Sequence, residues 1–202
     1  VGCGNGELLR LLRARWPEIE TATGADLSEQ VIEQNRRALP GIDFRVLDIE
    51  RAALPLRAEL VTCTEVVEHL DDRAAAFEHL AAMVAPGGAL ALTCPTGTVY
   101  ATERHFGHVS HPDVDELRAL GARAGLTLTR AANWGFPTYR LTKWLTNLKP
   151  ELALRTFAVE RYGAAQVLVS HAFTVANYAN LRSSPFGCQL FALFAKPVEA
   201  TR

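Results

Sequence analysis

Three side chains within five positions could do chemistry together: Glu65, Glu68 and His69. If this segment is helical, the spacing i, i+3 and i+4 places two carboxylates and an imidazole on one face. A further group of histidines follows downstream, at His105, His108 and His111. Carboxylates joined by imidazoles would form an octahedral site for Mg²⁺ or Mn²⁺ that keeps positions open for a substrate.

The same side chains can also act without a metal. In that case Glu65 accepts a hydrogen bond from a ligand amino group or from a backbone amide, and His69 lies on a helix surface. His108 or His105 would then be a general base, because the pKa of histidine lies near neutrality. The residues by themselves leave both interpretations open.

The chain opens on a glycine-rich loop, Val1-Gly2-Cys3-Gly4-Asn5-Gly6-Glu7. Glycines at alternate positions allow a tight turn and a close approach of the backbone to a ligand. Asp26 comes twenty residues after Gly6, at the end of a predicted strand, where a carboxylate can accept both hydroxyls of a ribose. Asp48 ends the next predicted strand and can face an adenine amino group, and Thr64 begins the loop that closes the same crevice.

These residues need elements that bring them to one edge of a sheet, and the chain supplies alternating strands and helices. Predicted strands cover residues 19–25, 43–47, 60–64, 89–94, 126–131 and 189–195. Predicted helices begin at residue 8 and after the capping residues Ser28, Asp72 and Asp113. This alternation predicts an α/β fold with a doubly wound sheet, and the length predicts a single domain over residues 1–202.

A glycine loop of this kind works between a strand and a helix, and no strand precedes it in this sequence. We therefore expect the natural protein to have upstream residues, including an apolar strand that ends near Val1.

The composition is that of an ordinary globular domain. The chain has 202 residues, 49% hydrophobic and 21% charged, which excludes a disordered chain or a coiled coil. Its net charge of -1 argues against a broadly basic surface, so we do not expect a nucleic-acid partner. The four cysteines are scattered, and no segment has the pattern of a membrane span or a signal peptide. We therefore expect a cytoplasmic protein that is not integral to a membrane.

The glycine loop, Asp26-Leu27-Ser28, Asp48-Ile49, residues 64–70 and Pro86-Gly87-Gly88 resemble class I S-adenosylmethionine-dependent methyltransferases. The resemblance covers about the first 130 residues and the last predicted strand. It implies a seven-stranded Rossmann-like sheet with a truncated N-terminal strand, and S-adenosylmethionine as cofactor. The implied cofactor-binding residues are Gly2, Cys3, Gly4, Gly6, Asp26, Leu27, Asp48, Ile49 and Thr64. The glycines would approach the methionine part, Asp26 the ribose, Asp48 and Ile49 the adenine, and Thr64 the sulfonium end.

Residues 65–69 are also similar to part of the ubiquinone-biosynthesis O-methyltransferases, where two glutamates and a histidine are associated with a divalent ion. A second similarity is to small-RNA 3′-terminal 2′-O-methyltransferases, where another histidine joins them. The resemblance implies Glu65, Glu68, His69 and His108 as metal ligands. With or without a metal, we expect His108, His69 and Glu65 to be the catalytic residues.

The expected reaction follows from that cofactor. A sulfonium methyl group is already activated, so the protein must align an acceptor behind it and keep that acceptor deprotonated. A metal or a histidine can do this for a hydroxyl, and we expect O-methylation of a small-molecule hydroxyl, with metal assistance left open. Two alternatives remain: methylation of the 3′-terminal ribose 2′-hydroxyl of an RNA, and a catalytically inactive protein that binds the cofactor. The sequence does not determine the oligomeric state.

A long segment, residues 134–187, separates the last two predicted strands and is expected to be a helical insertion. Its apolar residues recur at near-helical spacing, at Tyr139, Leu141, Trp144, Leu145 and Leu148. This stripe either packs the insertion onto the sheet or forms a lid with an apolar pocket for the acceptor. The insertion also carries basic side chains that could meet a phosphate or a membrane surface, at Arg140, Lys143, Lys149, Arg155 and Arg161.

Overall fold

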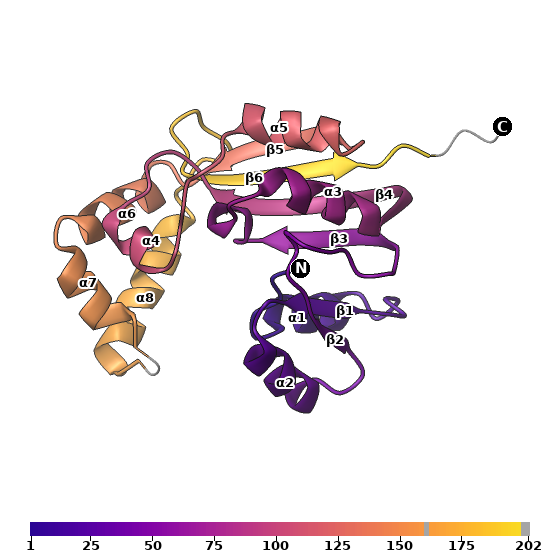
Figure 1. The fold of residues 1–202 in the computed structure, drawn as a ribbon. Coiled ribbons are helices and arrows are strands. Elements are labelled where there is room, and N and C mark those ends of the chain that lie inside the picture. The colour runs from indigo at the N-terminus through magenta and orange to yellow at the C-terminus, as the bar shows by residue number, and fades with distance from the viewer. Residues whose placement is uncertain (160–161, 199–202) are drawn as a thin grey trace.

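The computed structural model describes residues 1–159 and 162–198 as an α/β fold (Figure 1). The strands are β1 (Thr23–Asp26), β2 (Asp43–Val46), β3 (Ala58–Thr64), β4 (Val84–Pro95), β5 (Thr127–Trp134) and β6 (Gln189–Ala195). The α-helices are α1 (Glu7–Arg15), α2 (Glu29–Ala38), α3 (Arg73–Met83), α4 (Ala101–His105), α5 (Val114–Arg123), α6 (Thr138–Asn147), α7 (Pro150–Phe157) and α8 (Ala164–Asn177). A short 3₁₀ helix, η1 (Val67–His69), follows β3. The predicted alternation of strands and helices is confirmed.

The described strands form two sheets. β1 and β2 make a parallel pair, and the other strands form a mixed sheet in the order β3-β4-β6-β5. β3 and β4 are parallel, whereas β6 runs antiparallel to both of its neighbours. The structure thus describes six strands, and the seventh strand stays a prediction.

The start of the chain lies between these two sheets (Figure 1). The amino group of Val1 donates to the Thr62 carbonyl on β3 over 2.7 Å, and the Cys3 amide donates to the Ala25 carbonyl on β1 over 2.9 Å. A cavity of about 550 Å³ separates the facing edges of β1 and β3, and Val1 is part of its lining. The first residues therefore hold the glycine loop against both sheets.

The predicted helix caps are confirmed. Ser28 Oγ accepts from the Val31 amide, Asp72 Oδ1 accepts from Ala75, and Asp113 Oδ1 accepts from the first turn of α5. Each cap satisfies an amide that would otherwise lack a partner at the helix start. β4 begins earlier than predicted, because Pro86-Gly87-Gly88 belongs to the strand: Gly87 and Gly88 exchange backbone hydrogen bonds with Lys196.

The core lies between the four-stranded sheet and the helices α3 and α5. Phe77 of α3 and Phe194 of β6 are fully buried, with ring centroids 5.8 Å apart in an edge-to-face arrangement. Leu117 of α5 and Leu90 of β4 are buried in the same cluster. On the opposite face of β6, Phe191 is 44% exposed. This packing fixes the strands whose ends carry the candidate site.

The helices α6, α7 and α8 lie together beyond the carboxyl end of β3, to one side of the sheet (Figure 1). They occupy the segment between β5 and β6 that the sequence predicted as an insertion, and none of their residues is buried. Within the described residues, no helix has the length and apolar character needed to cross a bilayer.

Candidate functional site

The glycine loop is shaped by its contacts with the sheet edges. Gly2, Gly4 and Gly6 all have left-handed backbones, with φ of 65°, 48° and 73°. A Cβ on Gly2 would lie 2.1 Å from Val66 Cγ2, so packing as well as the backbone conformation requires glycine there, and a Cβ on Gly6 would lie 2.6 Å from Leu39 Cδ1. A Cβ on Gly4 would meet nothing within 4 Å. The space beside the Gly4 Cα is therefore open, as a ligand-binding loop requires.

Asp26 ties this loop to the end of β1. Its Oδ2 accepts from the Gly4 amide over 2.9 Å, and its Oδ1 accepts from the Ser28 amide over 3.0 Å. Asn35, a residue that the sequence reasoning missed, donates from Nδ2 to the Gly4 carbonyl over 2.6 Å and is buried on α2. The signal for Asn35 was a polar residue one turn after Ile32, on the inward face of a predicted helix.

The other residues of the predicted cofactor site divide into exposed and buried ones. Asp48 follows β2, where its Oδ1 accepts from the Glu50 amide and its Oδ2 lies 3.1 Å from Arg51 Nε. The Ile49 side chain belongs to the hydrophobic core. Leu27, an apolar residue of the predicted cofactor site, is 68% exposed and faces solvent.

The segment after β3 departs from the predicted single helical turn. Glu65 has a left-handed backbone with φ of 55°, and helical structure starts at Val67 as the 3₁₀ helix η1. The Glu65 Oε1 accepts from Thr93 Oγ1 over 2.8 Å and from Gln189 Nε2 over 2.6 Å. The prediction that Glu65, Glu68 and His69 share a helix face is therefore wrong, because β4 and β6 side chains hold the Glu65 carboxylate.

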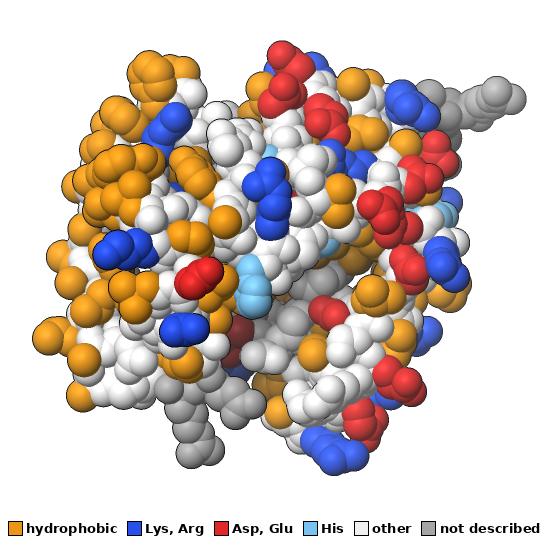
Figure 2. All heavy atoms as spheres, turned by 60° about the vertical axis from the view of Figure 1, so that its left-hand side comes forward, with side chains coloured by type: hydrophobic (Ala, Val, Ile, Leu, Met, Phe, Trp, Pro, Cys, Tyr) orange, Lys and Arg blue, Asp and Glu red, His pale blue; other side chains and the backbone are white. Residues whose placement is uncertain are grey.

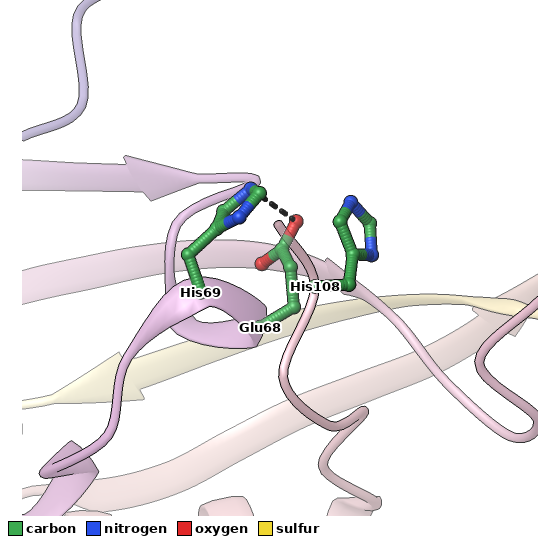
Figure 3. Close-up of side chains that lie close together, drawn as sticks. All are labelled: Glu68, His69 and His108. Carbon is green, nitrogen blue, oxygen red and sulfur yellow. Dashed lines mark ion pairs between the residues drawn. The ribbon is translucent and has the colours of Figure 1, made fainter. Parts of the chain in front are cut away.

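Glu68, His69 and His108 do come together (Figure 3). Their potential ligand atoms lie within 4.8 Å of one another, and His69 Nε2 is 4.0 Å from Glu68 Oε1. The Glu68 side chain is fully buried, and neither carboxylate oxygen has a hydrogen-bond partner among the described residues. Burial, helped by the nearby carboxylates of Glu65 and Glu103, raises the pKa of Glu68 to about 7.

Both histidines are oriented through their Nδ1 atoms. His69 Nδ1 lies 3.1 Å from the Gly107 carbonyl, and His108 Nδ1 lies 3.0 Å from His111 Nε2. These bonds leave the two Nε2 atoms as the uncommitted nitrogens. Burial lowers the pKa of His108, so its imidazole favours the neutral form.

A second cluster of ionisable side chains shares His108 with the cluster of Glu68, His69 and His108. Glu103, His108 and His111 form another cluster, in which the His111 side chain is fully buried and burial lowers its pKa. Lys143 of α6 lies 2.5 Å from Glu103 Oε1, and its ammonium group is 5.9 Å from the Tyr139 ring centroid. The helical insertion therefore contributes directly to the site.

The structure also shows where the remaining predicted site residues lie. His105 is exposed on α4, and Thr64 ends β3 next to Glu65. The contact of Gly2 with Val66 brings the glycine loop against the segment that carries Glu68 and His69. One edge of the fold thus joins a loop open to a ligand with a buried carboxylate and two imidazoles, groups that can bind a metal, hold an anion or accept a proton.

Comparisons with known proteins agree with this arrangement. A family model described as "Methyltransferase domain" matches residues 1–131. The chain is 30% identical over 138 residues to trans-aconitate 2-methyltransferase of Azoarcus sp. (strain BH72), which covers 65% of this chain and 51% of that protein. It is 36% identical over 95 residues to trans-aconitate 2-methyltransferase of Klebsiella pneumoniae (strain 342), covering 47% of this chain and 37% of that protein. The chain thus spans about half or less of these relatives.

Solved structures show the same fold at low sequence identity. An O-methyltransferase from a trans-AT PKS multienzyme of Brevibacillus brevis, in complex with S-adenosyl-L-homocysteine, matches with a TM-score of 0.64 and 16% identity, over 98% of this chain and 65% of that one. The phosphoethanolamine N-methyltransferase 2 of Haemonchus contortus, in complex with S-adenosyl-L-methionine, matches with a TM-score of 0.62 and 16% identity, over 97% of this chain and 47% of that one.

Proposed function

Because this chain belongs to the methyltransferase-domain family, we propose that it transfers the methyl group of S-adenosylmethionine to a carboxylate oxygen of a small organic acid. The observation that carries the proposal is the contact of Gly2 with Val66, which brings the candidate cofactor loop next to Glu68 and His69. The curated relatives are named for trans-aconitate, a carboxylic acid, and this supports a carboxylate as the acceptor.

The residues at the edge of β1 and β2 fit S-adenosylmethionine. The open space beside Gly4 lets backbone groups approach an amino acid moiety. Asp26 ends β1 and Asp48 follows β2, where they can accept hydrogen bonds from a ribose and an adenine amino group. When bound, the cofactor supplies a methyl group on a positively charged sulfur. The chain has to orient an acceptor oxygen toward that methyl group and exclude water.

A carboxylate acceptor needs no general base, because it is already ionised at neutral pH. What it needs are donors that hold the anion in place. Lys143 carries an ammonium group at the cluster, and His108 presents an Nε2–H when its Nδ1 accepts from His111. His69 Nδ1 donates to the Gly107 carbonyl, so its neutral ring presents Nε2 as an acceptor. For a hydroxyl acceptor, the neutral imidazole of His108 could remove the proton instead. The hydroxyl remains our alternative acceptor.

The chemical stability of the product separates these acceptors. The protein is incubated with S-adenosylmethionine tritiated in its methyl group and with panels of tricarboxylic acids, dicarboxylic acids, catechols and vicinal diols. Mild alkali releases volatile methanol from a methyl ester and leaves a methyl ether intact. We expect alkali-labile label from the acid panel, and little label from Asp26→Asn.

Other outcomes decide between the alternatives. Alkali-stable label on a diol or catechol would overturn the carboxylate and support the hydroxyl acceptor, and label on an RNA 3′ end would support the ribose. Calorimetric binding of S-adenosylhomocysteine without transfer to any panel would support a cofactor-binding protein without catalysis.

A metal-assisted reaction is a second candidate, favoured by the buried Glu68 carboxylate that has no partner in the described part of the chain. Glu68, His69 and His108 offer one oxygen and two nitrogens, a donor set that suits Mn²⁺ better than Mg²⁺, which prefers oxygen ligands. The Gly107 carbonyl and His111 would orient the two imidazoles from behind. Glu65 lies outside this set: its carboxylate is not among the clustered ligand atoms, and its Oε1 accepts from Thr93 and Gln189.

Electron paramagnetic resonance tests this candidate without reference to activity. Titration of Mn²⁺ into the protein is expected to suppress the signal of the free ion at one ion per chain. Glu68→Gln and His108→Ala should weaken binding at least tenfold, whereas Glu65→Gln should leave it unchanged. An undiminished free-ion signal, or equal damage from Glu65→Gln and Glu68→Gln, would remove the metal from the proposal.

A further inference from the structure

The helix α6 is amphipathic with its polar side turned inward. Lys143 and Asn147 face the candidate site, where Lys143 pairs with Glu103 and Asn147 Oδ1 accepts from Thr102. The opposite side of α6 carries large apolar residues that are about half exposed: Leu141 53%, Trp144 51%, Leu145 47% and Leu148 58%. Their spacing of three, one and three residues places them on one helix face. Of the predicted stripe, Tyr139 packs against Trp134 at the end of β5 and lies beside Lys143, whereas the other four residues are about half exposed.

The neighbouring helices extend the exposed apolar surface. Leu152 of α7 is 59% exposed. On α8, large side chains at helical spacing are exposed on one side: Val167 41%, Leu168 72%, Val175 68% and Tyr178 86%. We call these residues, with the apolar face of α6, the outer face of the insertion. Figure 2 shows hydrophobic side chains spread over this side of the molecule, with basic side chains among them.

The apolar exposure is concentrated in the insertion. Of the 25 large hydrophobic residues that are exposed in the described chain, 14 lie between residues 134 and 187. That segment is about a quarter of the sequence, so the surface is far more apolar here than elsewhere. Contiguous apolar surface of this kind marks an interaction site, because soluble proteins rarely leave it open to water.

The charge of the insertion differs from that of the rest of the chain. Residues 134–187 contain six basic residues (Lys and Arg) and two acidic ones, both Glu. The rest of the chain contains 15 basic residues and 20 acidic ones. Arg140, Lys149 and Arg155 are exposed in or beside the outer face, as is the acidic Glu151, and the second acidic residue of the insertion, Glu160, lies outside the described residues. Arg161, also noted in the sequence, lies outside the described residues. The surface is therefore both apolar and basic.

We propose that the outer face of the insertion docks on a lipid bilayer that contains anionic lipids. Amphipathic helices with an apolar face and flanking basic residues lie in the interface of such bilayers, and each Lys or Arg near the surface strengthens the attraction. Trp144 and Tyr178 suit this interface, where aromatic side chains that combine an apolar ring with a polar group accumulate. A second copy of the chain is a poorer occupant, because a symmetric contact would bring basic residues against their own copies.

Vesicle binding tests this proposal on the whole chain. Vesicles of phosphatidylcholine with 30% phosphatidylglycerol are expected to sediment the protein at 0.1 M salt, and pure phosphatidylcholine is expected to bind it at least tenfold more weakly. With Trp16 and Trp134 replaced by Phe, the emission of Trp144 should shift to shorter wavelength as the anionic vesicles bind.

Matched variants test which residues of the surface contact the vesicles. Leu145→Glu with Leu168→Glu, and separately Lys149→Glu with Arg155→Glu, should each weaken vesicle binding at least tenfold. Leu11→Glu on α1 (52% exposed) and Arg123→Glu on α5 are the corresponding controls away from the insertion and should bind as the parent does.

Three results would overturn the proposal. These are absence of sedimentation with the anionic vesicles, equal loss in the insertion variants and their controls, and a dimer in solution that the Leu145→Glu and Leu168→Glu changes dissociate. The last result would assign the outer face to a second copy of the chain.

Discussion

The four-stranded sheet and the helical insertion meet at the same candidate site, and they are stabilised in opposite ways. The sheet buries Phe77, Leu117 and Phe194 completely between its strands and two helices. The insertion has no buried residue in α6, α7 or α8, and hydrogen bonds such as Thr138 Oγ1 to the Ala176 carbonyl join its helices.

This difference separates what holds the site from what can adapt around it. The buried side of the site, with Glu68, rests on a close-packed core, and the glycine loop beside it is held by hydrogen bonds to β1 and β3. The insertion adds Lys143 and Tyr139 from an element that buries little apolar surface. Elements of low burial open at small free-energy cost, so we expect motion near the site to come from the insertion.

Removing an aromatic ring from the core of the four-stranded sheet should strongly destabilise the protein. Phe77→Ala is expected to lower the free energy of unfolding by about 3–5 kcal/mol, because it leaves a cavity against Phe194. Leu168→Ala is the matched change in the insertion and should stay within about 0.5 kcal/mol, since Leu168 is 72% exposed. Urea unfolding followed by circular dichroism measures both, and equal losses would contradict the contrast.

Sequence reasoning reached the elements with strong local signals. Side-chain caps at Ser28, Asp72 and Asp113 fixed the helix starts, and the short apolar runs fixed most strands, with β6 at its predicted bounds. It failed at Pro86-Gly87-Gly88, where a bond from Gly87 to Lys196, distant in sequence, overrides the local turn signal.

The candidate site was predictable where a motif or a resemblance covers its parts, and this includes His108, which joins Glu68 and His69 from a distant loop. The glycine loop and Asp26 follow a local pattern, and the structure joins them by a hydrogen bond. Glu65 was misplaced because its partners Thr93 and Gln189 come from two other strands. The inverted orientation of α6 was equally hidden, since periodicity reveals an apolar face and does not tell which way it points.

The buried carboxylate of Glu68 should give the sheet side of the site a pH-dependent stability. The pKa of Glu68 in the folded protein is about 7, above its ordinary value of 4.5, so the folded state holds a proton that the unfolded state has lost between these values. Stability from this group is present below about pH 4.5, falls as the pH rises, and is lost above pH 7, by roughly 3 kcal/mol in total.

Glu68→Gln removes this titration. Measured by urea unfolding with a chelator present, the variant should gain roughly 2 kcal/mol relative to the parent between pH 5 and pH 8. Glu78→Gln, on the exposed side of α3, is the control and should show no such gain. Parallel pH profiles for the parent and Glu68→Gln would show that Glu68 is ionised in the folded protein at both pH values.

The junction between the loop and β1 should control cofactor affinity. Asp26→Asn replaces a charged acceptor of the Gly4 and Ser28 amides and weakens the predicted bond to a ribose. We expect the dissociation constant of S-adenosylhomocysteine, measured by calorimetry, to rise roughly 10- to 100-fold, or about 1.4–2.7 kcal/mol. Asp43→Asn, whose carboxylate pairs with Arg45 on the surface, should leave it unchanged. Unchanged affinity in Asp26→Asn would place the ribose elsewhere.

The smallest effects are expected on the apolar side of α6, and they test which face of this helix serves the reaction. Trp144→Ala should change the free energy of unfolding by less than about 1 kcal/mol and leave transfer to a water-soluble acceptor unaltered, because Trp144 is 51% exposed on the outer face. Lys143→Ala, one position earlier, removes the partner of Glu103 and should lower the transfer rate several-fold at unchanged cofactor affinity. If Trp144→Ala instead abolished transfer with the cofactor still bound, α6 would close over the acceptor as a lid with its apolar face inward. The inward placement of Lys143, Asn147 and Tyr139 argues for the opposite outcome, since a polar inner face suits a charged acceptor and an apolar outer face suits a partner.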